Sequence, residues 1–212
     1  MQGFSCVMGQ RIRKVERYIA GQPGQIGILL HDRKTGVTWG NANADTDFPA
    51  ASTVKLAMIT DLLLRRRDGA ISLGSYDFEL IDSVLTASSD TAADQLWFSF
   101  EDAGFLQRIQ RFGMRTASFT SSAYWGFMYC SARDLDGLMN YVLSDIPPGD
   151  RDFITRRLRH VSAIQQWGVW GAGQNNHPGN KDGWEDDGGV WIVDTVGFAG
   201  PHARYTLAIM DD

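Results

Sequence analysis

The sequence of 212 residues lacks the features that mark several common protein classes. It has two cysteines, Cys6 and Cys130, which form neither a CxxC pair nor a metal pattern and leave the redox compartment open. No apolar run approaches the roughly 20 residues of a membrane span, and Arg and Glu interrupt residues 1–20, where a signal peptide needs an apolar centre. We therefore expect no membrane span, and either a cytoplasmic protein or a chain written without its leader.

An excess of basic charge is also missing. The formal net charge is −5 and the isoelectric point is near 5.3, so no basic stripe is available to neutralise phosphates. The sequence therefore predicts that nucleic acid is not a partner. Its arginine clusters are expected to be solvated helix surface: Arg65 to Arg67, and Arg156, Arg157 and Arg159.

Several motifs of metal and cofactor enzymes are absent. The four histidines, His31, His160, His177 and His202, show neither an HxxxH pair nor an HxE with cysteine partners, so we expect no bound metal. The sequence has no GxSxG motif, and residues 168–179 have neither a Walker lysine nor a full GxGxxG. We therefore expect no cofactor.

The apolar patterning predicts strands at both ends and helices in the middle. We expect a helix over residues 10–20, strands at 25–31 and 37–40, a buried helix from Ser52, further helices between 76 and 158, and strands at 190–193 and 205–210. This order favours an α/β fold of the α+β type: an antiparallel sheet formed by N- and C-terminal strands with packed helices, and an inserted all-helical lobe. Residues 1–51 plus 160–212 would form a discontinuous α/β lobe and residues 52–159 a mainly helical lobe, together a single compact unit.

Ser52 and Lys55 place a hydroxyl and an amine one helical turn apart at the start of the buried helix. Burial disfavours an ammonium ion, so a lysine there can become neutral and take the proton of a nearby serine. The unpaired N–H groups of a helix start can stabilise an oxyanion. An N-cap serine with a surface lysine remains the alternative for this pair taken alone.

Lysine is scarce in this chain. Of 20 cationic side chains only four are lysines, Lys14, Lys34, Lys55 and Lys181. Arginine stays charged, whereas a buried lysine can lose its proton, so a lysine in an apolar helix is a candidate base.

Three motifs stand in order along the chain: S-x-x-K at 52–55, S-D-T at 89–91 and K-D-G at 181–183. The set resembles the penicillin-recognising serine enzymes, the β-lactamase-like hydrolases and penicillin-binding proteins with S-x-x-K, S-D-N and K-T-G. The predicted order of strands and helices also agrees with that fold. The Lys-Asp-Gly-Trp segment and the residues that follow it are similar to a related serine hydrolase group of actinobacteria.

The resemblance implies a role for each matching residue. Ser52 would be the nucleophile and Lys55 the general base, Ser89 would shuttle a proton to the leaving group, and Lys181 would be its electrostatic partner. The N–H groups of Ser52 and Trp184 would form the oxyanion hole. The substrate-binding residues would be Thr91, Asp182, Gly183 and Trp184.

The sequence departs from the family pattern at three places. Thr91 replaces the usual asparagine, which removes an amide that can bond both substrate and lysine. Asp182 replaces the usual threonine and would repel a substrate carboxylate unless it is protonated or paired, so we expect poor binding of ordinary penicillins. Residues 112–130 contain no acidic residue to activate a deacylating water, and Asp134 and Asp136 after them are expected to face solvent at a helix start.

Two functions follow as hypotheses. The first is a serine hydrolase or acyltransferase that forms an acyl-enzyme on an amide or ester, with D,D-peptidase, acyltransferase or esterase chemistry favoured over efficient β-lactamase activity. The second is a binding or scaffold protein that keeps the fold after losing catalysis. In either case we expect a monomer with a small-molecule or peptide-like ligand.

Overall fold

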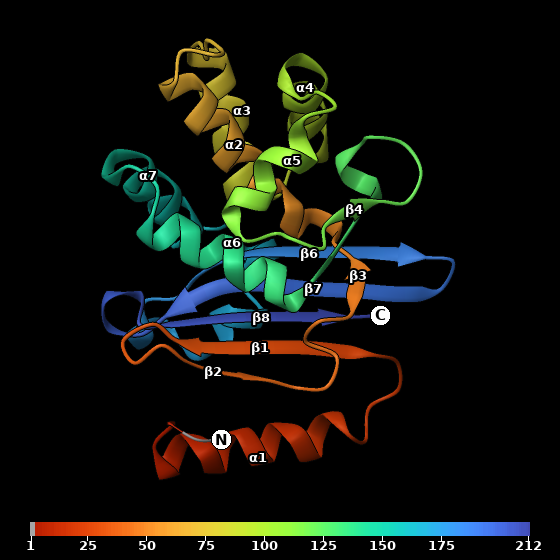
Figure 1. Cartoon of the computed structure of the whole chain (residues 1–212), viewed down its shortest axis with the longest axis vertical. Helices are drawn as coiled ribbons and strands as arrows, with labels where there is room; N and C mark the ends of the chain where they lie inside the picture. Colours follow the sequence, from red (N-terminus) through yellow and green to blue (C-terminus); the bar gives the residue numbers. More distant parts are fainter. Residues whose placement is uncertain (1–2) are drawn as a thin grey trace.

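The computed structural model describes residues 3–212, and its centre is a five-stranded antiparallel sheet in the order β2-β1-β8-β7-β6 (Figure 1). The strands come from the two ends of the chain, as the sequence predicts. They are β1 (Ile26–Asp32), β2 (Val37–Gly40), β6 (Gly179–Asp187), β7 (Val190–Ala199) and β8 (Tyr205–Asp211). A small second sheet, which the sequence analysis did not predict, has the order β3-β5-β4 and consists of β3 (Asp47–Pro49), β4 (Ser118–Phe119) and β5 (Met128–Ser131).

Helix α1 (Cys6–Ile19) runs beside the β2 edge, and the other helices gather on one side of the sheet (Figure 1). These are α2 (Lys55–Arg67), α3 (Ser75–Ala87), α4 (Asp90–Phe100), α5 (Phe105–Ile109), α6 (Ala132–Ser144) and α7 (Pro148–Leu158). Within residues 3–212, none of these helices has the length and apolar character to cross a bilayer.

Helix α2 is the centre of the core. Neither Gly nor Pro interrupts residues 52–67, and the helix ends before Gly69, whose φ of +73° continues no helix. Its side chains are buried from Lys55 to Leu63. A helix buried on all sides needs neighbours on all sides, which α3, α4 and α5 supply together with the short turn that precedes α2.

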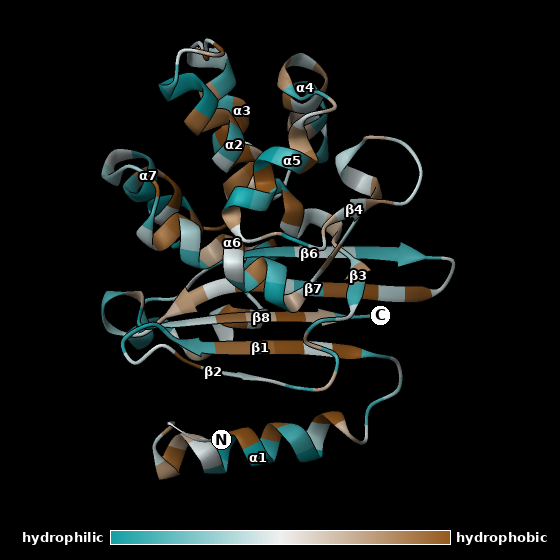
Figure 2. Ribbon diagram, in the orientation of Figure 1, coloured by the Kyte–Doolittle hydropathy of each residue, from teal (hydrophilic) through white to brown (hydrophobic). Residues whose placement is uncertain are grey.

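Strand β6 is the main element that the sequence pattern did not reveal. Its sequence, GNKDGWEDD, has glycines and charges and no alternation of apolar residues, and it is coloured mostly as hydrophilic in Figure 2. It forms a strand because it pairs with β7 along its whole length, from Gly179 with Phe198 to Asp187 with Val190. Its first five residues are buried, so tertiary contacts outweigh the low strand propensity.

The start of α6 differs from the expectation that Asp134 and Asp136 face solvent. Both are buried, with 2% and 6% of their surface exposed. Asp134 accepts bonds from the Arg115 and Thr116 N–H groups, and Asp136 accepts one from Thr206 Oγ1. These carboxylates hold α6 to the preceding loop and to β8, which explains their burial.

A buried carboxylate pair joins α2 to the end of α4. Asp61 and Glu101 have 3% and 0% of their side-chain surface exposed, and Arg108 donates to Asp61 at 2.8 Å and to Glu101 at 2.7 Å. Burial raises the pKa of Glu101 to about 8, and the charge of Asp61 adds to this rise. The pair therefore holds a proton at neutral pH, as two carboxylates at one site do.

This pair predicts a pH dependence of stability. From about pH 4.5 to about pH 8 the folded chain keeps a proton on Glu101 that the unfolded chain has lost, so the free energy of unfolding falls as pH rises. Glu101→Gln should remove this contribution, which has a slope of up to about 1.4 kcal/mol per pH unit. Urea unfolding of both proteins from pH 5 to 8 measures it, and the variant should gain stability over the parent as pH rises.

The matched control is Asp102→Asn, because Asp102 bonds the same arginine but is 57% exposed. It should leave the slope unchanged. Parallel curves for the parent and Glu101→Gln would show that the pair holds no such proton.

Candidate active site

Ser52 lies in a short 3₁₀ turn, residues 51–54, that leads into α2. In 3₁₀ geometry residues three apart are eclipsed, so Ser52 and Lys55 lie on one side of the turn. Ala51 before it has a φ of +40°, a left-handed conformation that turns the chain sharply from β3 into the helix. Ser52 itself is 9% exposed, so its hydroxyl sits at the edge of the protein interior.

Lys55 is fully buried and points to the junction of α3 and α4. Its Nζ donates to the Ser88 carbonyl at 2.9 Å and to the Asp90 carboxylate, and lies 4.3 Å from the centre of the Trp125 ring. Burial lowers the pKa of Lys55, while the bond to Asp90 opposes this shift. Among residues 3–212 no hydrogen bond joins Lys55 Nζ to Ser52 Oγ.

The second serine of the site is Ser88. The Lys181 ammonium donates to Ser88 Oγ at 2.8 Å, whereas Ser89 accepts from the Ala92 N–H and caps α4. The reason is local: Ser88 is the left-handed C-cap of α3, with φ of 58°, which directs its side chain toward β6 and leaves Ser89 as the next N-cap. The sequence analysis expected Ser89 beside Lys181, and this position belongs to Ser88.

Three acceptors surround the buried ammonium of Lys181. Besides Ser88 Oγ they are Gln165 Oε1 at 2.7 Å and the Asp182 carbonyl at 2.7 Å. Gln165 is itself buried and donates to the Leu85 and Thr86 carbonyls at the end of α3. Burial lowers the pKa of Lys181 well below its usual value, and the charge of Lys55 lowers it further.

Gly183 lets β6 pass directly against the turn that carries Ser52. A Cβ at this position would lie 2.7 Å from the Ser52 nitrogen and 2.9 Å from the Thr53 nitrogen, so only glycine fits without a shift. The Asp182 N–H and C=O point off the outer edge of β6, to Gln165 and Lys181. By the alternation of an antiparallel ladder, Trp184 presents its N–H to the same outer edge.

Asp182 faces away from Ser52. Side chains alternate along a strand, so Asp182 lies on the opposite face of β6 from Lys181 and Gly183. It is 0% exposed and its Oδ1 accepts from Thr195 Oγ1 at 2.6 Å. Burial raises the pKa of Asp182 to about 6, and the Thr195 bond opposes this rise. The expected repulsion between this carboxylate and a substrate in the cleft therefore lacks its geometric basis.

Asp90, not Thr91, contacts the catalytic-lysine candidate. Thr91 is exposed on α4, and no hydrogen bond joins it to Lys55 or Lys181 in the described part of the chain. One turn beyond Asp90, Asp94 accepts from Trp125 Nε1 at 2.9 Å and from Tyr124 Oη at 2.6 Å. Asp94 thereby holds the loop of residues 113–127, and with it the Trp125 ring above Lys55.

The structure thus gathers Lys55, Ser88 and Lys181 into one hydrogen-bonded cluster, with Ser52 one turn before Lys55 and Gly183 against its backbone. The sequence analysis missed Ser88, Asp90, Asp94, Trp125 and Gln165. Of these, Ser88 and Asp90 belong to the segment that the motif search selected, displaced by one residue. No group of three or more His, Cys, Asp or Glu within residues 3–212 is arranged to hold a metal ion.

Sequence comparisons found a matching family model and similar proteins in mycobacteria. The model of the beta-lactamase enzyme family matches residues 10–75, which include Ser52 and Lys55. The protein named "Putative lipoprotein LppW" in Mycobacterium tuberculosis and Mycobacterium bovis is 26% identical over 212 residues, covering 94% of this chain and 67% of that protein.

Solved structures of the same fold include β-lactamases and the protein named PBP-A. The class A β-lactamase from Mycobacterium abscessus superposes with a TM-score of 0.77 at 18% identity, over 96% of this chain and 89% of the enzyme. The β-lactamase from Xanthomonas campestris gives 0.79 at 17% identity, over 97% and 88%. PBP-A gives 0.79 at 20% identity, over 94% and 86%. The chain therefore has the fold of the class A β-lactamases, and its residues 10–75 match the model of the beta-lactamase enzyme family.

Proposed function

We propose that this protein is a serine hydrolase or acyltransferase that forms an acyl-enzyme at Ser52 on an amide or ester substrate. The observation that carries the proposal is the contact of Lys181 Nζ with Ser88 Oγ at 2.8 Å beside the Lys55 ammonium, which bonds the carbonyl of the same serine at 2.9 Å. Two buried lysines that converge on one serine, next to a second serine at a helix start, are costly for folding. Acyl transfer needs such an arrangement, because a serine nucleophile is activated by an adjacent base.

The proposed reaction begins with attack of Ser52 Oγ on the substrate carbonyl while neutral Lys55 takes the hydroxyl proton. The N–H groups of Ser52 and Trp184 would stabilise the oxyanion of the tetrahedral intermediate. The intermediate then collapses, the bond to the leaving group breaks, and the Ser88 hydroxyl passes its proton to that group. Lys55, which received the Ser52 proton, returns one to Ser88, so the protons balance.

Lys55 must change partners for this step. Its Nζ is bonded to Asp90 and to the Ser88 carbonyl, and Asp90 stabilises the ammonium form that cannot accept a proton. Asp90 is 73% exposed, so water competes with the contact and the lysine can leave it. Without substrate, Asp90 holds Lys55 away from Ser52, and acylation requires the Lys55 amine to turn from Asp90 to Ser52.

Deacylation is expected to be slow. The loop of residues 113–127 carries no carboxylate, and it places the Trp125 ring over Lys55. Asp94, the nearby acid, is occupied by two donors from the same loop. Without a free base for water, the acyl group should persist on Ser52 or pass to another acceptor.

The alternative is a binding or scaffold protein. Two observations favour it: Lys55 forms an ion pair with Asp90, and no hydrogen bond joins Lys55 to Ser52 in the described chain. A charged Lys55 held away from Ser52 does not act as its base. Labelling of Ser52 separates the two functions, because only the enzyme forms a covalent adduct.

The first prediction concerns the nucleophile. Incubation with a fluorophosphonate, and separately with a fluorescent penicillin, should add the mass of one acyl or phosphonyl group to the parent protein, and Ser52→Ala should show none. Intact-mass spectrometry measures the adduct. An adduct that survives Ser52→Ala would refute this nucleophile, and a parent protein unlabelled by either probe would favour the scaffold.

The second prediction separates two adjacent serines. Ser88→Ala removes the hydroxyl that would pass the proton, which is one of the three acceptors of Lys181, and should slow fluorophosphonate labelling by on the order of 100-fold. Ser89→Ala removes only a helix cap and should cost about 1 kcal/mol of stability while leaving the labelling rate within about threefold. The opposite ranking of the two rates would return the catalytic role to Ser89.

The third prediction concerns Asp90. Because Asp90 stabilises the ammonium form, Asp90→Asn should lower the pKa of Lys55 further and move the half-maximal labelling rate to lower pH. At neutral pH the variant should therefore label faster than the parent. The control is Asp82→Asn, which changes an exposed carboxylate on α3 that is paired with Arg157. An unchanged pH profile in Asp90→Asn would mean that Lys55 does not set the rate.

A further inference from the structure

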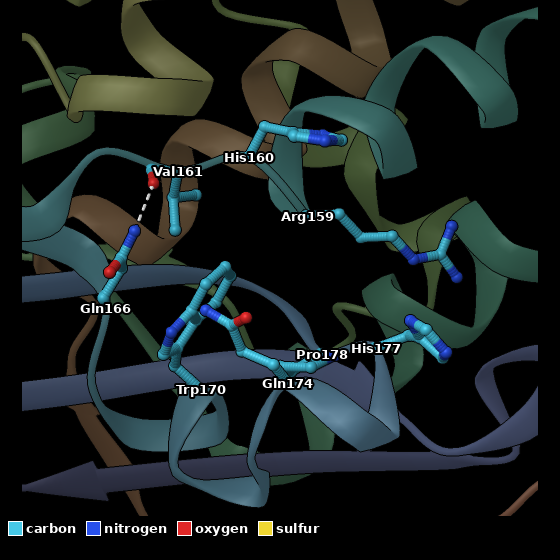
Figure 3. Close-up of a pocket in the computed structure, with 8 residues that line it drawn as sticks. All are labelled: Arg159, His160, Val161, Gln166, Trp170, Gln174, His177 and Pro178. Carbon is cyan, nitrogen blue, oxygen red and sulfur yellow. Dashed lines mark hydrogen bonds between the residues drawn. The ribbon is translucent and has the colours of Figure 1, made fainter.

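A second site lies beyond the Ser52 cluster. A cavity of about 540 Å³ opens between the end of α7 and the segment that leads into β6 (Figure 3). Three basic side chains line it, Arg159, His160 and His177, and none of its lining residues in the described chain is acidic. An excess of basic donors in a cavity favours an anion.

Arg159 has no ionic partner among residues 3–212. Its guanidinium lies over the ring of Phe198 at 4.9 Å, and its Nε is buried without a hydrogen-bond partner. The neighbouring acid on α7, Asp152, lies 3.8 Å from Arg151. The guanidinium therefore has no carboxylate that neutralises it within the described chain, and an anionic ligand in the cavity would supply the missing charge. The sequence analysis had assigned this arginine to solvated surface.

The remaining walls supply further donors and one flat apolar surface. His160 uses Nδ1 in a 2.7 Å contact with the Arg156 carbonyl, which leaves its other ring nitrogen for a ligand. The amide of Gln174 also reaches the cavity, and the Trp170 indole forms its lower wall (Figure 3). The half-buried indole offers a stacking surface for a planar group.

We infer that this cavity binds a small anion, a carboxylate or a phosphate monoester, that carries a planar apolar group. The anion contacts Arg159 and the two histidines, and the planar group lies against Trp170. The inference does not depend on acylation at Ser52, because it rests on different residues and needs no reaction.

Isothermal titration calorimetry of the full chain with phenyl phosphate and with benzoate tests the site. Inorganic phosphate and the uncharged benzyl alcohol test the anionic and apolar parts separately. At least one of the two aromatic anions should bind, and more tightly than either partial probe, and the phosphate and carboxylate arms show which anion the site prefers. No heat from either anion at 10 mM, on the order of the weakest specific affinities, would overturn the proposal.

Two variants and one control locate the binding. Arg159→Gln should weaken the preferred anion by about tenfold or more, since it removes a charge-assisted bond. His177→Asn should also weaken it, and Asn tolerates the φ of 46° found there, so the fold is kept even if Arg159→Gln unfolds. Arg13→Gln removes the same charge from an exposed position on α1, which does not line this cavity, and should leave the affinity unchanged. Equal affinity in all three, or equal binding of benzyl alcohol, would refute the site.

Discussion

The burial of the Lys181 ammonium is the constraint from which the rest of the site follows. An ammonium with 0% exposure is tolerated only if its donors are satisfied, and here the three acceptors come from three segments of the chain: the end of α3, the segment before β6, and β6 itself. Two of the acceptors tie other segments to β6. Ser88 joins the end of α3 to the strand, and Gln165 joins residues 161–166 both to the strand and to the last carbonyls of α3, whereas the Asp182 carbonyl belongs to the strand itself. The strand so placed brings Gly183 against the backbone of Ser52.

The second buried lysine, Lys55, has the partners of an ammonium ion and not those of a neutral base. Burial lowers the pKa of both lysines and the charge of Lys55 lowers that of Lys181 further, yet both have acceptors suited to an ammonium. Asp90 is the only carboxylate bonded to Lys55 among the described residues, and it is mostly exposed. The balance between burial, which favours the neutral amine, and Asp90, which favours the charged one, therefore decides whether Lys55 can serve as a base.

The sequence predicted those features of the fold and the site that depend on residues close together in the chain. The pair Ser52 and Lys55 is one turn of helix, so spacing alone placed both on one side, and the sheet from both ends of the chain followed from apolar patterning. The choice between Ser88 and Ser89 was not local. The match to the S-D-N motif favoured Ser89 because Asp90 follows it. In the structure Ser89 caps the N-terminus of α4, and Ser88 accepts the hydrogen bond from Lys181. Strand β6 was not predicted for a similar reason: it is held by its pairing with β7, and its own residues have no strand-like pattern.

The buried acids extend this lesson to function. Asp182, Asp194, Asp134 and Asp136 are all inside the protein, although an acidic chain rich in aspartate would be expected to place them at the surface. Asp194 has an Oδ2 without a partner among residues 3–212, and burial raises the pKa of this carboxyl well above the usual range. Asp90 and Asp94 on α4 are the carboxylates whose charges raise the pKa of Lys55 against the effect of burial. The charge state of Lys55 consequently depends on α4 more than on the strand that carries the third motif, so substitutions of Asp90 and Asp94 should change the pKa of Lys55 more than a substitution of Asp182.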